Sequence, residues 1–426
     1  MLSIMTLIIG FCLLTLFGQW RAFDILVWIC IVSFSVAFMI DISLSKKYRP
    51  YQVPLACGLL LRVFLLLYDL YTDNPLHLPH VGGALSSDPL RFYNTAIESA
   101  QGYKTIYGGF FSRFLGFFFR VMTPSRLLAE YIVLLFSIAT ILAFANILLE
   151  INVSQHRKVL SVYLISLLPN YAFMSAILRR ETVISFFVSL SILYFIKWLK
   201  GDSTENNYIL AFVFALVASL FHAGTGLIIA SYIFFRIIYS PKRKTFTLDP
   251  ENLIIAVFFV GIAMFLYGRF GTVLFNKIEK RLSSGNLVTT RDDGGSSYAK
   301  YVGDARTPIR MIVFFIPRLL YFMFSPFPWQ WRGISDIISF SLSSFVYLLI
   351  ILRAFKYIRY AKKDDENRLL LVALLFVLLL SAAFFSWGVS NTGTAIRHRD
   401  KFIAIIATLF ALSERNIKRK TKYYLT

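Results

Sequence analysis

Charged residues are scarce in this chain, and that scarcity is the first constraint on its class. Of 426 residues only 16% are charged, whereas 57% are hydrophobic, and the mean hydropathy is +0.66. A water-soluble domain of this length has to present a polar surface, which this composition does not supply. The charges fall in short clusters between long apolar runs, so we expect many membrane spans.

Cysteines and recognisable cofactor motifs are scarce as well. The three cysteines, Cys12, Cys30 and Cys57, lie inside apolar stretches without metal-ligand spacing, which argues against a cysteine nucleophile and a structural zinc site. The sequence also lacks a Walker loop, a Rossmann fingerprint, a zinc motif and a nucleophile elbow. We therefore disfavour an ATP-driven pump or an enzyme with a cytosolic nucleotide-sugar domain. We expect no cofactor, although an outward carboxylate could hold a divalent cation.

Long apolar segments are what the chain has in abundance. They predict an all-α, polytopic transmembrane bundle of about twelve spans that forms a single membrane domain over residues 1–426. The first segment has no upstream basic region and no small-residue cleavage site, so we expect an uncleaved helix there. The expected spans lie near residues 2–17, 22–43, 52–71, 127–149, 158–177, 182–199, 207–221, 225–239, 252–269, 335–352, 367–388 and 400–413.

Lysines and arginines indicate how these spans are oriented. The formal net charge is +21, and membrane anchoring explains it better than nucleic-acid binding does. The basic clusters of alternate loops are Lys46–Arg49, Arg157–Lys158, Lys197–Lys200, Arg236–Lys244, Arg353–Lys363 and the tail from Arg415. All of them fall on one side if both termini are cytoplasmic, which is the orientation that the positive-inside rule favours.

Two long segments, at about 72–126 and 270–334, then face outward. The first contains GGFFSRFLGFFFRVM, in which Arg113 and Arg120 are seven residues apart and share one helix face, a pattern typical of a helix lying in the membrane interface. In the second, the apolar stretch 308–325 carries arginines and a proline, so we expect an interfacial or re-entrant helix. A polar, glycine-containing loop before it could order over a bound substrate.

Asp88 and His222 are the candidate catalytic residues for proton transfer. Asp88 lies in SSDPLRFYNTA, where an outward carboxylate near the membrane surface could act as a general base, and where Pro89 also predicts an ordinary helix start. His222 lies in LFHAGTG, where a group that titrates near neutral pH is followed by glycines that permit close backbone approach. A packed, hydrogen-bonded histidine is the alternative for His222.

Basic residues on the outward side are candidates for substrate binding. Topology does not explain them, and adjacent arginines can offer forked donors to phosphate oxygens while a carboxylate orients them. Ordinary ion pairs or attraction to lipid head groups are the alternatives. The residues are Arg179, Arg180 and Glu181 between two spans, and Arg397, His398 and Arg399 before the last span.

Two further outward residues have a candidate role in substrate binding. Arg291 lies in the polar loop beside two aspartates, where a solvated charge cluster is the alternative. Trp329 lies in SPFPWQWR, where an indole could stack on a sugar ring or simply anchor the chain at the level of the head groups.

The chain resembles bacterial multi-pass glycosyltransferases of the GT-C type, and more narrowly the Wzy-like polymerases of O-antigen and capsular repeat units. The resemblance covers most of the chain as architecture and is carried by SSDPLRFYNTA, RRE, HAGTG, SPFPWQW and GTAIRHR. Asp88 matches the acidic residue of the first large outer loop of GT-C enzymes, and the outward arginines match those on which Wzy-like polymerases rely. The soluble C-terminal domain of many GT-C enzymes is absent, which favours the polymerase end of the family.

The resemblance implies a GT-C-like bundle in the bacterial cytoplasmic membrane that transfers saccharide units from a polyprenyl-(di)phosphate-linked donor on the extracytoplasmic side. The arginines would stabilise the departing diphosphate, and Asp88 or His222 would remove a proton from the acceptor hydroxyl. Expected partners are the lipid-linked saccharide, membrane lipids and other polysaccharide-assembly proteins, with no nucleic acid.

Two other classes of protein remain open. A flippase of lipid-linked oligosaccharide or a small-solute carrier would suit twelve spans, but should place ionisable residues near the bilayer midplane. Arg62 and Asp69 are the deepest that the sequence offers. A scaffold subunit of an assembly complex would tolerate changes at the outward arginines. The clustering of charge at one face favours an enzyme.

Overall fold

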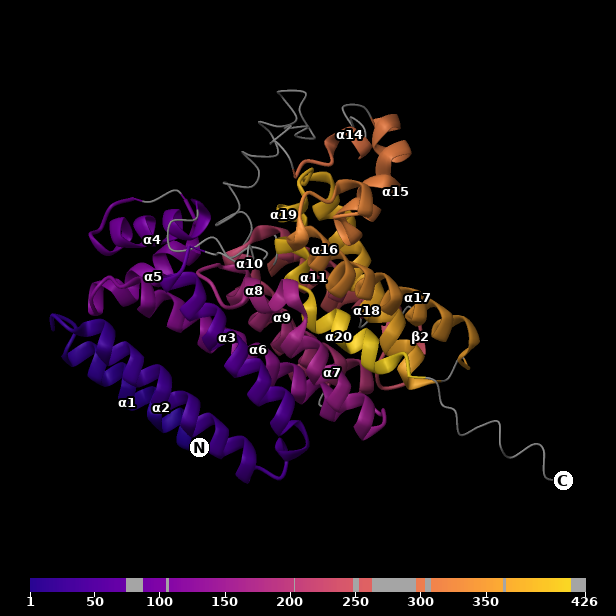
Figure 1. Ribbon diagram of the computed structural model, residues 1–426. Helices are drawn as coiled ribbons and strands as arrows, with labels where there is room; N and C mark the ends of the chain where they lie inside the picture. Colours follow the sequence, from indigo (N-terminus) through magenta and orange to yellow (C-terminus); the bar gives the residue numbers. More distant parts are fainter. Residues whose placement is uncertain are drawn as a thin grey trace.

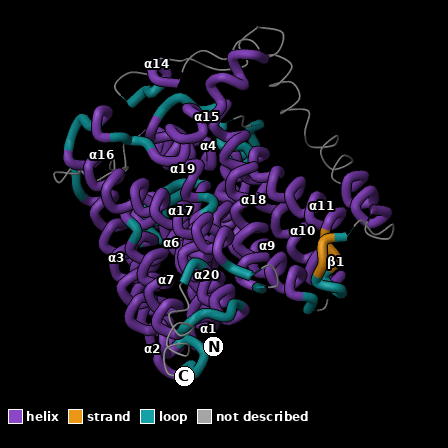
Figure 2. The backbone as a smooth tube through the Cα atoms, turned by 90° about the vertical axis from the view of Figure 1, so that its right-hand side faces the viewer, coloured by secondary structure: helices purple, strands orange, loops and turns teal. Residues whose placement is uncertain are grey.

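Helices account for nearly all of the regular structure (Figure 1). The computed structural model describes residues 1–73, 87–104, 107–202, 204–247, 253–262, 296–302, 308–362 and 365–414. Within these ranges the strands form one short antiparallel hairpin, β1 (Tyr239–Ser240) with β2 (Thr245–Phe246), and Figure 2 shows it at the margin of the helices. The all-α class expected from the sequence is confirmed.

The helices depart from the expected spans mainly where proline or polar residues interrupt an apolar run. The 3₁₀ turn η2 (Ala223–Gly226) joins two expected spans, and the π-helical turn η4 (Phe340–Ser344) lies within one. The α-helices are α1 (Leu2–Leu16), α2 (Phe23–Leu44), α3 (Gln52–Tyr71), α4 (Ser87–Ala100), α5 (Phe110–Val121), α6 (Arg126–Glu150), α7 (Gln155–Leu167), α8 (Pro169–Met174), α9 (Glu181–Lys200), α10 (Thr204–Phe221), α11 (Leu227–Ile238), α14 (Ala299–Val302), α15 (Pro308–Phe324), α16 (Ile334–Ser339), α17 (Phe345–Tyr360), α18 (Glu366–Trp387), α19 (Thr392–Asp400) and α20 (Ile403–Leu412).

Six helices of the described part are long and apolar enough to cross a membrane. They are Phe23–Leu44, Arg49–Tyr71, Arg126–Glu150, Glu181–Lys200, Ile334–Tyr360 and Glu366–Trp387. Six more apolar helices, of 10–17 residues, are shorter than the ~20 residues that cross hydrocarbon unaided. Several spanning helices thus support a membrane protein, and the count of twelve spans stays a prediction.

The bundle is built around α6 and α9, the most deeply buried of the candidate spans. Ser125 caps the start of α6 by accepting a hydrogen bond from the backbone N–H of Leu128, and α9 ends at Gly201, whose φ of 90° is left-handed. An ion pair of 3.3 Å between Lys197 Nζ and Glu150 Oε1 joins the last turns of the two helices, which therefore run parallel. Their first turns lie together at the other end of the bundle, about 30 Å away for a helix of this length.

Both ends of the described chain lie where α6 and α9 finish. The N-terminal amine pairs with Asp41 in the last turn of α2 at 2.8 Å, whereas Asp24 in its first turn accepts a 2.5 Å hydrogen bond from Ser125 at the start of α6. Glu414 accepts a hydrogen bond of 2.9 Å from the backbone N–H of Ser154, just beyond α6. The two ends of the described chain share one end of the bundle, and the placement of the termini in the cytoplasm stays a prediction.

The span expected at 158–177 is interrupted and is not one helix. Pro169 has no backbone N–H with which to continue α7, so α7 stops just before it and α8 begins there. Arg62 of α3 satisfies the carbonyl groups left free by this break, since its guanidinium donates to the oxygen of Ser166 at 2.8 Å and to that of Ile165 at 3.5 Å. A buried arginine thus stabilises a helix break inside the bundle.

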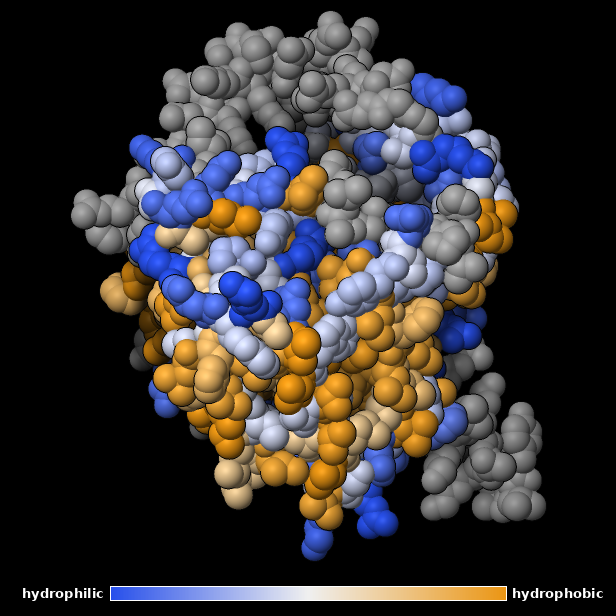
Figure 3. Space-filling model, turned by 60° about the vertical axis from the view of Figure 1, so that its left-hand side comes forward, coloured by the Kyte–Doolittle hydropathy of each residue, from blue (hydrophilic) through white to orange (hydrophobic). Residues whose placement is uncertain are grey.

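The two long segments expected to face outward contain helices of their own. In the first, α4 and α5 pack together, and Arg120 on α5 donates to the carbonyl oxygens of Ser99 and Ala100 at the end of α4, each at 3.1 Å. In the second, the expected helix at 308–325 is present as α15. On the face shown in Figure 3, hydrophilic residues cap a broad hydrophobic band. The placement of α5 and α15 in a membrane interface stays a prediction.

Candidate functional site

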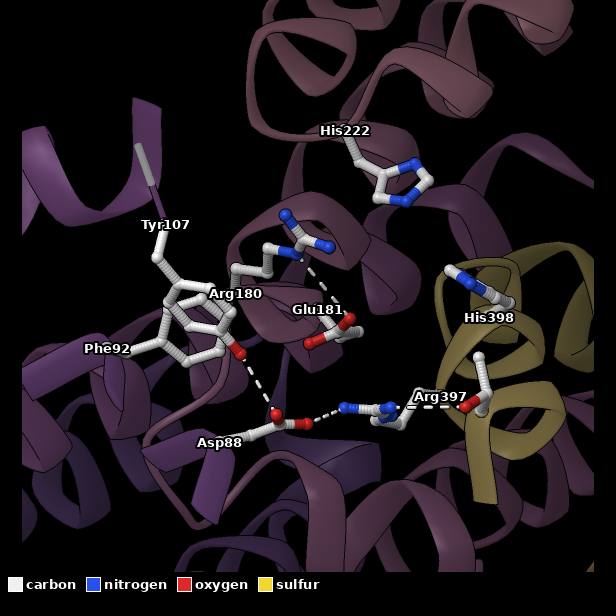
Figure 4. Close-up of a pocket in the computed structure, with 9 residues that line it drawn as sticks. Asp88, Phe92, Tyr107, Arg180, Glu181, His222, Arg397 and His398 are labelled. Atoms are coloured by element: carbon white, nitrogen blue, oxygen red, sulfur yellow. Dashed lines mark hydrogen bonds and ion pairs between the residues drawn. The ribbon is translucent and has the colours of Figure 1, made fainter. Parts of the chain in front are cut away.

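A polar pocket of about 210 Å³ lies at the end of the bundle where α9 begins. Four parts of the chain form it: α4 with the segment that follows it, the start of α9, the turn between α10 and α11, and α19 (Figure 4). Its lining residues are Asp88, Phe92, Tyr107, Arg180, Glu181, His222, Thr394, Arg397 and His398. Six of these nine were candidates from the sequence, and the fold brings them together from positions up to 310 residues apart (398 − 88).

Several of the pocket side chains lie at the ends of helices. Asp88 lies in the first turn of α4, directly before Pro89, so its interpretation as a helix-start residue and its place in the pocket hold together. Arg180 occupies the N-cap of α9 and Glu181 its first turn. Helix N-termini carry partial positive charge and backbone N–H groups without helical partners, which favours negative charge in the space between them.

Three donors converge on the carboxylate of Asp88. The hydroxyl of Tyr107 donates to Oδ1 at 2.9 Å, Arg179 Nη1 lies 3.4 Å from Oδ2, and Arg397 Nη1 makes a close ion pair with the same oxygen. Figure 4 shows Tyr107 and Arg397 reaching Asp88 from opposite sides. The second terminal nitrogen of Arg397 donates to the hydroxyl of Thr394 at 3.2 Å, which fixes the plane of the guanidinium.

These neighbours determine the charge of Asp88. Partial burial raises the pKa of its carboxyl group, but the nearby Arg397 guanidinium, the Tyr107 hydroxyl and Arg179 together outweigh burial and lower the pKa below its usual value. Asp88 is therefore ionised at neutral pH and acts as an anionic clamp between cationic groups. A carboxylate held in this way is a weak base until one of its donors leaves.

Arg180 and Glu181, at the start of α9, form a second charged group of the pocket. Arg180 Nε lies 3.8 Å from Glu181 Oε1, and the buried Lys401 approaches the same oxygen at 3.9 Å. Both contacts are longer than those around Asp88. The Arg180 side chain is 28% exposed, and its guanidinium also lies 5.9 Å from the centre of the Phe92 ring at the pocket wall. It is thus placed to receive an anionic group that enters the pocket.

The two histidines lie side by side. The centres of the His222 and His398 rings are 5.1 Å apart, and both rings pack on Phe385. Gly224 makes this packing feasible, because a Cβ atom there would lie 2.6 Å from the Phe385 ring. The glycine after His222 is therefore needed for a close approach of protein atoms. His398 Nδ1 lies 2.6 Å from Lys401 Nζ.

Four of the candidates from the sequence do not line the pocket. Arg179 is buried directly behind it and touches it only through Asp88. Arg399 points away, since it is fully buried and donates to the carbonyl oxygens of Met323 at 2.6 Å and Ser325 at 2.8 Å. The other two are Trp329, which is 60% exposed and stacks on Phe327, and Arg291, which lies outside the described residues.

Sequence reasoning missed four residues of the site: Phe92, Tyr107, Thr394 and Lys401. Phe92 and Thr394 stand within the segments already singled out, one turn of helix from Asp88 and Arg397 respectively. Tyr107 follows α4 in a part of the chain without periodicity, so nothing local identifies it. Lys401 comes three residues after His398, the spacing that puts two side chains on one helix face, and that spacing was the available signal.

Among the described residues, no group of three or more His, Cys, Asp or Glu side chains is arranged to hold a metal ion. The two carboxylates of the pocket, Asp88 and Glu181, are each paired with basic side chains. This part of the chain therefore offers no ready donor set for the divalent cation considered from the sequence.

Comparisons of the chain with models of protein families, with curated proteins and with solved structures found no match. The functional interpretation depends on the residues of the pocket and on their geometry.

Proposed function

We propose that the chain is a membrane glycosyltransferase of the polymerase kind. It transfers saccharide units from a polyprenyl-(di)phosphate-linked donor on the extracytoplasmic side of a bacterial cytoplasmic membrane, in the synthesis of cell-surface polysaccharide. One observation carries the proposal: at the end of an apolar helical bundle, Arg180, Arg397, His222 and His398 surround one small pocket that also holds an acidic residue, Asp88. Two guanidinium groups and two imidazole rings that converge beside hydrocarbon suit an anionic head group on a lipid tail.

The ion pair between Asp88 and Arg397 gives the pocket a means of responding to such a donor. A diphosphate that enters the pocket competes with the Asp88 carboxylate for the same guanidinium, because both are oxygen anions. When Arg397 turns to the phosphate, Asp88 loses the strongest of its cationic neighbours while it stays partly buried. Its proton affinity rises as a result, so binding of the donor converts the clamp into a base.

The transfer step then balances as follows. The acceptor hydroxyl loses its proton to a carboxylate oxygen of Asp88, and the hydroxyl oxygen forms a bond to the anomeric carbon of the donor sugar. The bond from that carbon to the phosphate oxygen breaks, and its electron pair leaves with the diphosphate. Arg180 and Arg397 lie where they can stabilise the charge that develops on the leaving group. The energy of the sugar–diphosphate bond drives the reaction, so no ATP is needed.

The test is the length of surface polysaccharide in cells that depend on this chain. In Asp88→Ala and Arg180→Ala variants we expect long polymers to be lost, with the transfer step slowed by roughly a hundredfold or more. Single lipid-linked repeats should accumulate on the outer side. Arg113→Ala is the matched control, because Arg113 is an exposed arginine of α5 outside the pocket. Unchanged polysaccharide at a normal level of the Asp88→Ala and Arg180→Ala proteins would rule the enzyme out.

A carrier or flippase of lipid-linked oligosaccharide is the second candidate, and one cluster favours it. Arg126 lies between two buried carboxyl groups, with Nε 2.6 Å from Glu130 Oε1 and Nη2 3.6 Å from Asp69 Oδ2. Buried ionisable residues in spanning helices are typical of transporters. These three lie in the last turn of α3 and the first turns of α6, away from the middle of either helix. In the assay above, a carrier would instead leave lipid-linked repeats on the inner side.

A further inference from the structure

Both pocket histidines have their Nδ1 atom facing a donor of the protein. The backbone N–H of Gly224 donates to His222 Nδ1 at 3.2 Å, so that nitrogen carries the lone pair. The neutral ring of His222 then has its proton on Nε2. His398 Nδ1 lies 2.6 Å from Lys401 Nζ. Lys401 Nζ therefore has the same position relative to His398 Nδ1 as the Gly224 N–H has relative to His222 Nδ1. The two imidazoles are thus arranged alike by unrelated neighbours.

Lys401 is fully buried, and its surroundings indicate the direction of the hydrogen bond to His398. Its Nζ lies 3.9 Å from Glu181 Oε1 and 5.2 Å from the centre of the Phe385 ring. A buried ammonium group needs a compensating charge, an acceptor or a π face, and this position supplies all three. Burial lowers the pKa of Lys401 well below its ordinary value, and Glu181 acts against burial. In the charged form that Glu181 favours, Lys401 has donors and no lone pair, so His398 Nδ1 is the acceptor and Nε2 carries the proton.

We propose that Lys401 is a positioning residue that fixes the tautomer of His398, so that a neutral His398 carries its proton on Nε2, as His222 does, and presents that N–H group to the pocket. Neither histidine is then the base of the reaction, a role that the sequence left open for His222. The role of the histidines toward a ligand rests on the proposed function, whereas the positions of their protons do not depend on it.

The groups around His398 favour this neutral form. Burial, then Lys401, His222, Arg397 and Arg180 hold the pKa of His398 well below its ordinary value, so an imidazolium is disfavoured. The one carboxylate on this side, Glu181, is shared between Arg180 and Lys401. A ring that does not ionise can stabilise negative charge through its N–H without giving up the proton.

This arrangement narrows the class of ligand. The pocket offers two guanidinium groups and the Nε2–H group of His398 as donors, while Asp88 already accepts from three neighbours and Glu181 is shared by Arg180 and Lys401. Such a surface matches a group that only accepts hydrogen bonds, such as a phosphate ester or a diphosphate. It matches an uncharged sugar hydroxyl poorly, since that group must also donate. The histidines therefore serve the leaving group, and the acceptor hydroxyl is left to Asp88.

The direct test is ¹⁵N NMR of the full-length protein labelled at histidine and held in lipid nanodiscs at neutral pH. His222→Gln and His398→Gln variants assign the signals. We expect both rings as neutral Nε2–H tautomers in the unmodified protein and in Lys401→Arg. In Lys401→Met, which has a similar volume, His398 should become a mixture of tautomers while His222 keeps its signal and so reports an intact fold. An Nδ1–H tautomer or an imidazolium at His398 in the unmodified protein, or no change in Lys401→Met, overturns the proposal.

Addition of inorganic pyrophosphate to the same samples separates this proposal from the proposed function. We expect the Nε2 signals of both histidines to shift in the unmodified protein, and the shift at His398 to weaken in Lys401→Met. If the tautomers are as described but pyrophosphate moves neither signal, the diphosphate ligand is wrong and the role of Lys401 stands. If pyrophosphate binds while His398 has its proton on Nδ1, the role of Lys401 is wrong and the anion site stands.

Discussion

Asp88 shows how opposing influences determine the role of a single residue. Burial acts to protonate its carboxyl group, whereas Arg397, Tyr107 and Arg179 act to ionise it, and these three together are stronger. The group was a candidate base from the sequence. In the structure its carboxylate is paired with Arg397, which makes it a weak base. Under the proposed function it becomes the base when Arg397 binds the phosphate of the donor instead.

Removal of Arg397 tests this dependence without any substrate. In Arg397→Ala we expect the pKa of Asp88 to rise, because burial then acts against fewer cations. The ionised carboxylate contributes stability above its unfolded pKa of about 3.9 and loses it as the pH falls through the lowered folded value, so the acid transition should move to higher pH in the variant. Carboxyl ¹³C NMR titration, with Asp88→Asn to assign the signal, measures the shift. A pKa that is unchanged or lower would contradict the clamp.

At the scale of the element, buried arginines hold broken helices together. The guanidinium of Arg62 donates to carbonyl groups of α3 and α7 and to side chains from α6 and from the segment after α8. Arg399 donates to the carbonyl groups at the end of α15. Carbonyl groups left bare in a membrane interior are costly, so a break such as that at Pro169 needs an internal donor. These arginines are structural, although the basic cluster in which Arg399 lies made it resemble a binding residue.

The contribution of Arg62 can be measured as stability. Arg62→Met keeps most of the volume but leaves several buried oxygens without a donor, so we expect the free energy of unfolding in detergent to fall by about 2–4 kcal/mol. Leu60→Ala on the same helix is the control, because Leu60 is 64% exposed and its loss should change stability by less than ~1 kcal/mol. Equal unfolding midpoints for Arg62→Met and the unmodified protein would show that the break between α7 and α8 does not need Arg62 for its stability.

At the scale of the whole molecule, the pocket and the basic loops occupy opposite ends. α9 begins at the pocket with Glu181 and ends with Lys197 and Lys200, whose ion pairs to Glu150 and Glu366 are 3.3 Å and 3.4 Å long. If the basic end is cytoplasmic, as the positive-inside rule predicts, the pocket opens on the other side. The side of the membrane on which the pocket opens therefore follows from the orientation of the bundle.

Labelling of single cysteines in intact cells answers that question. With Cys12, Cys30 and Cys57 replaced by serine, we expect a membrane-impermeant thiol reagent to label Arg113→Cys near the pocket end and to spare Lys47→Cys at the other end. Both positions are exposed in the fold, so access depends on the side of the membrane. After permeabilisation both should react. The opposite pattern would place the pocket in the cytoplasm and remove the extracytoplasmic enzyme from consideration.

The sequence by itself determined the helical membrane class and the position of most helices. Apolar runs of about 20 residues can satisfy their backbone groups in hydrocarbon only as helices, so composition suffices for that inference. It also marked Asp88, Arg180 and Arg397, since charge beside hydrocarbon is costly and needs a reason. It did not reveal the break at Pro169, because an apolar run with one proline still looks continuous when its neighbours are unknown.

Only the tertiary structure decided which charged residues share the pocket. Arg397 and Arg399 are two residues apart on α19, and a helix turns about 100° per residue, so their side chains point to nearly opposite faces: one to Asp88, the other to buried carbonyl groups. Local sequence gives them the same chemistry and cannot tell which face meets which neighbour. Tyr107 returns to Asp88 from the segment after α4, and Lys401 approaches Glu181 from a distant part of the chain, so packing decides both contacts.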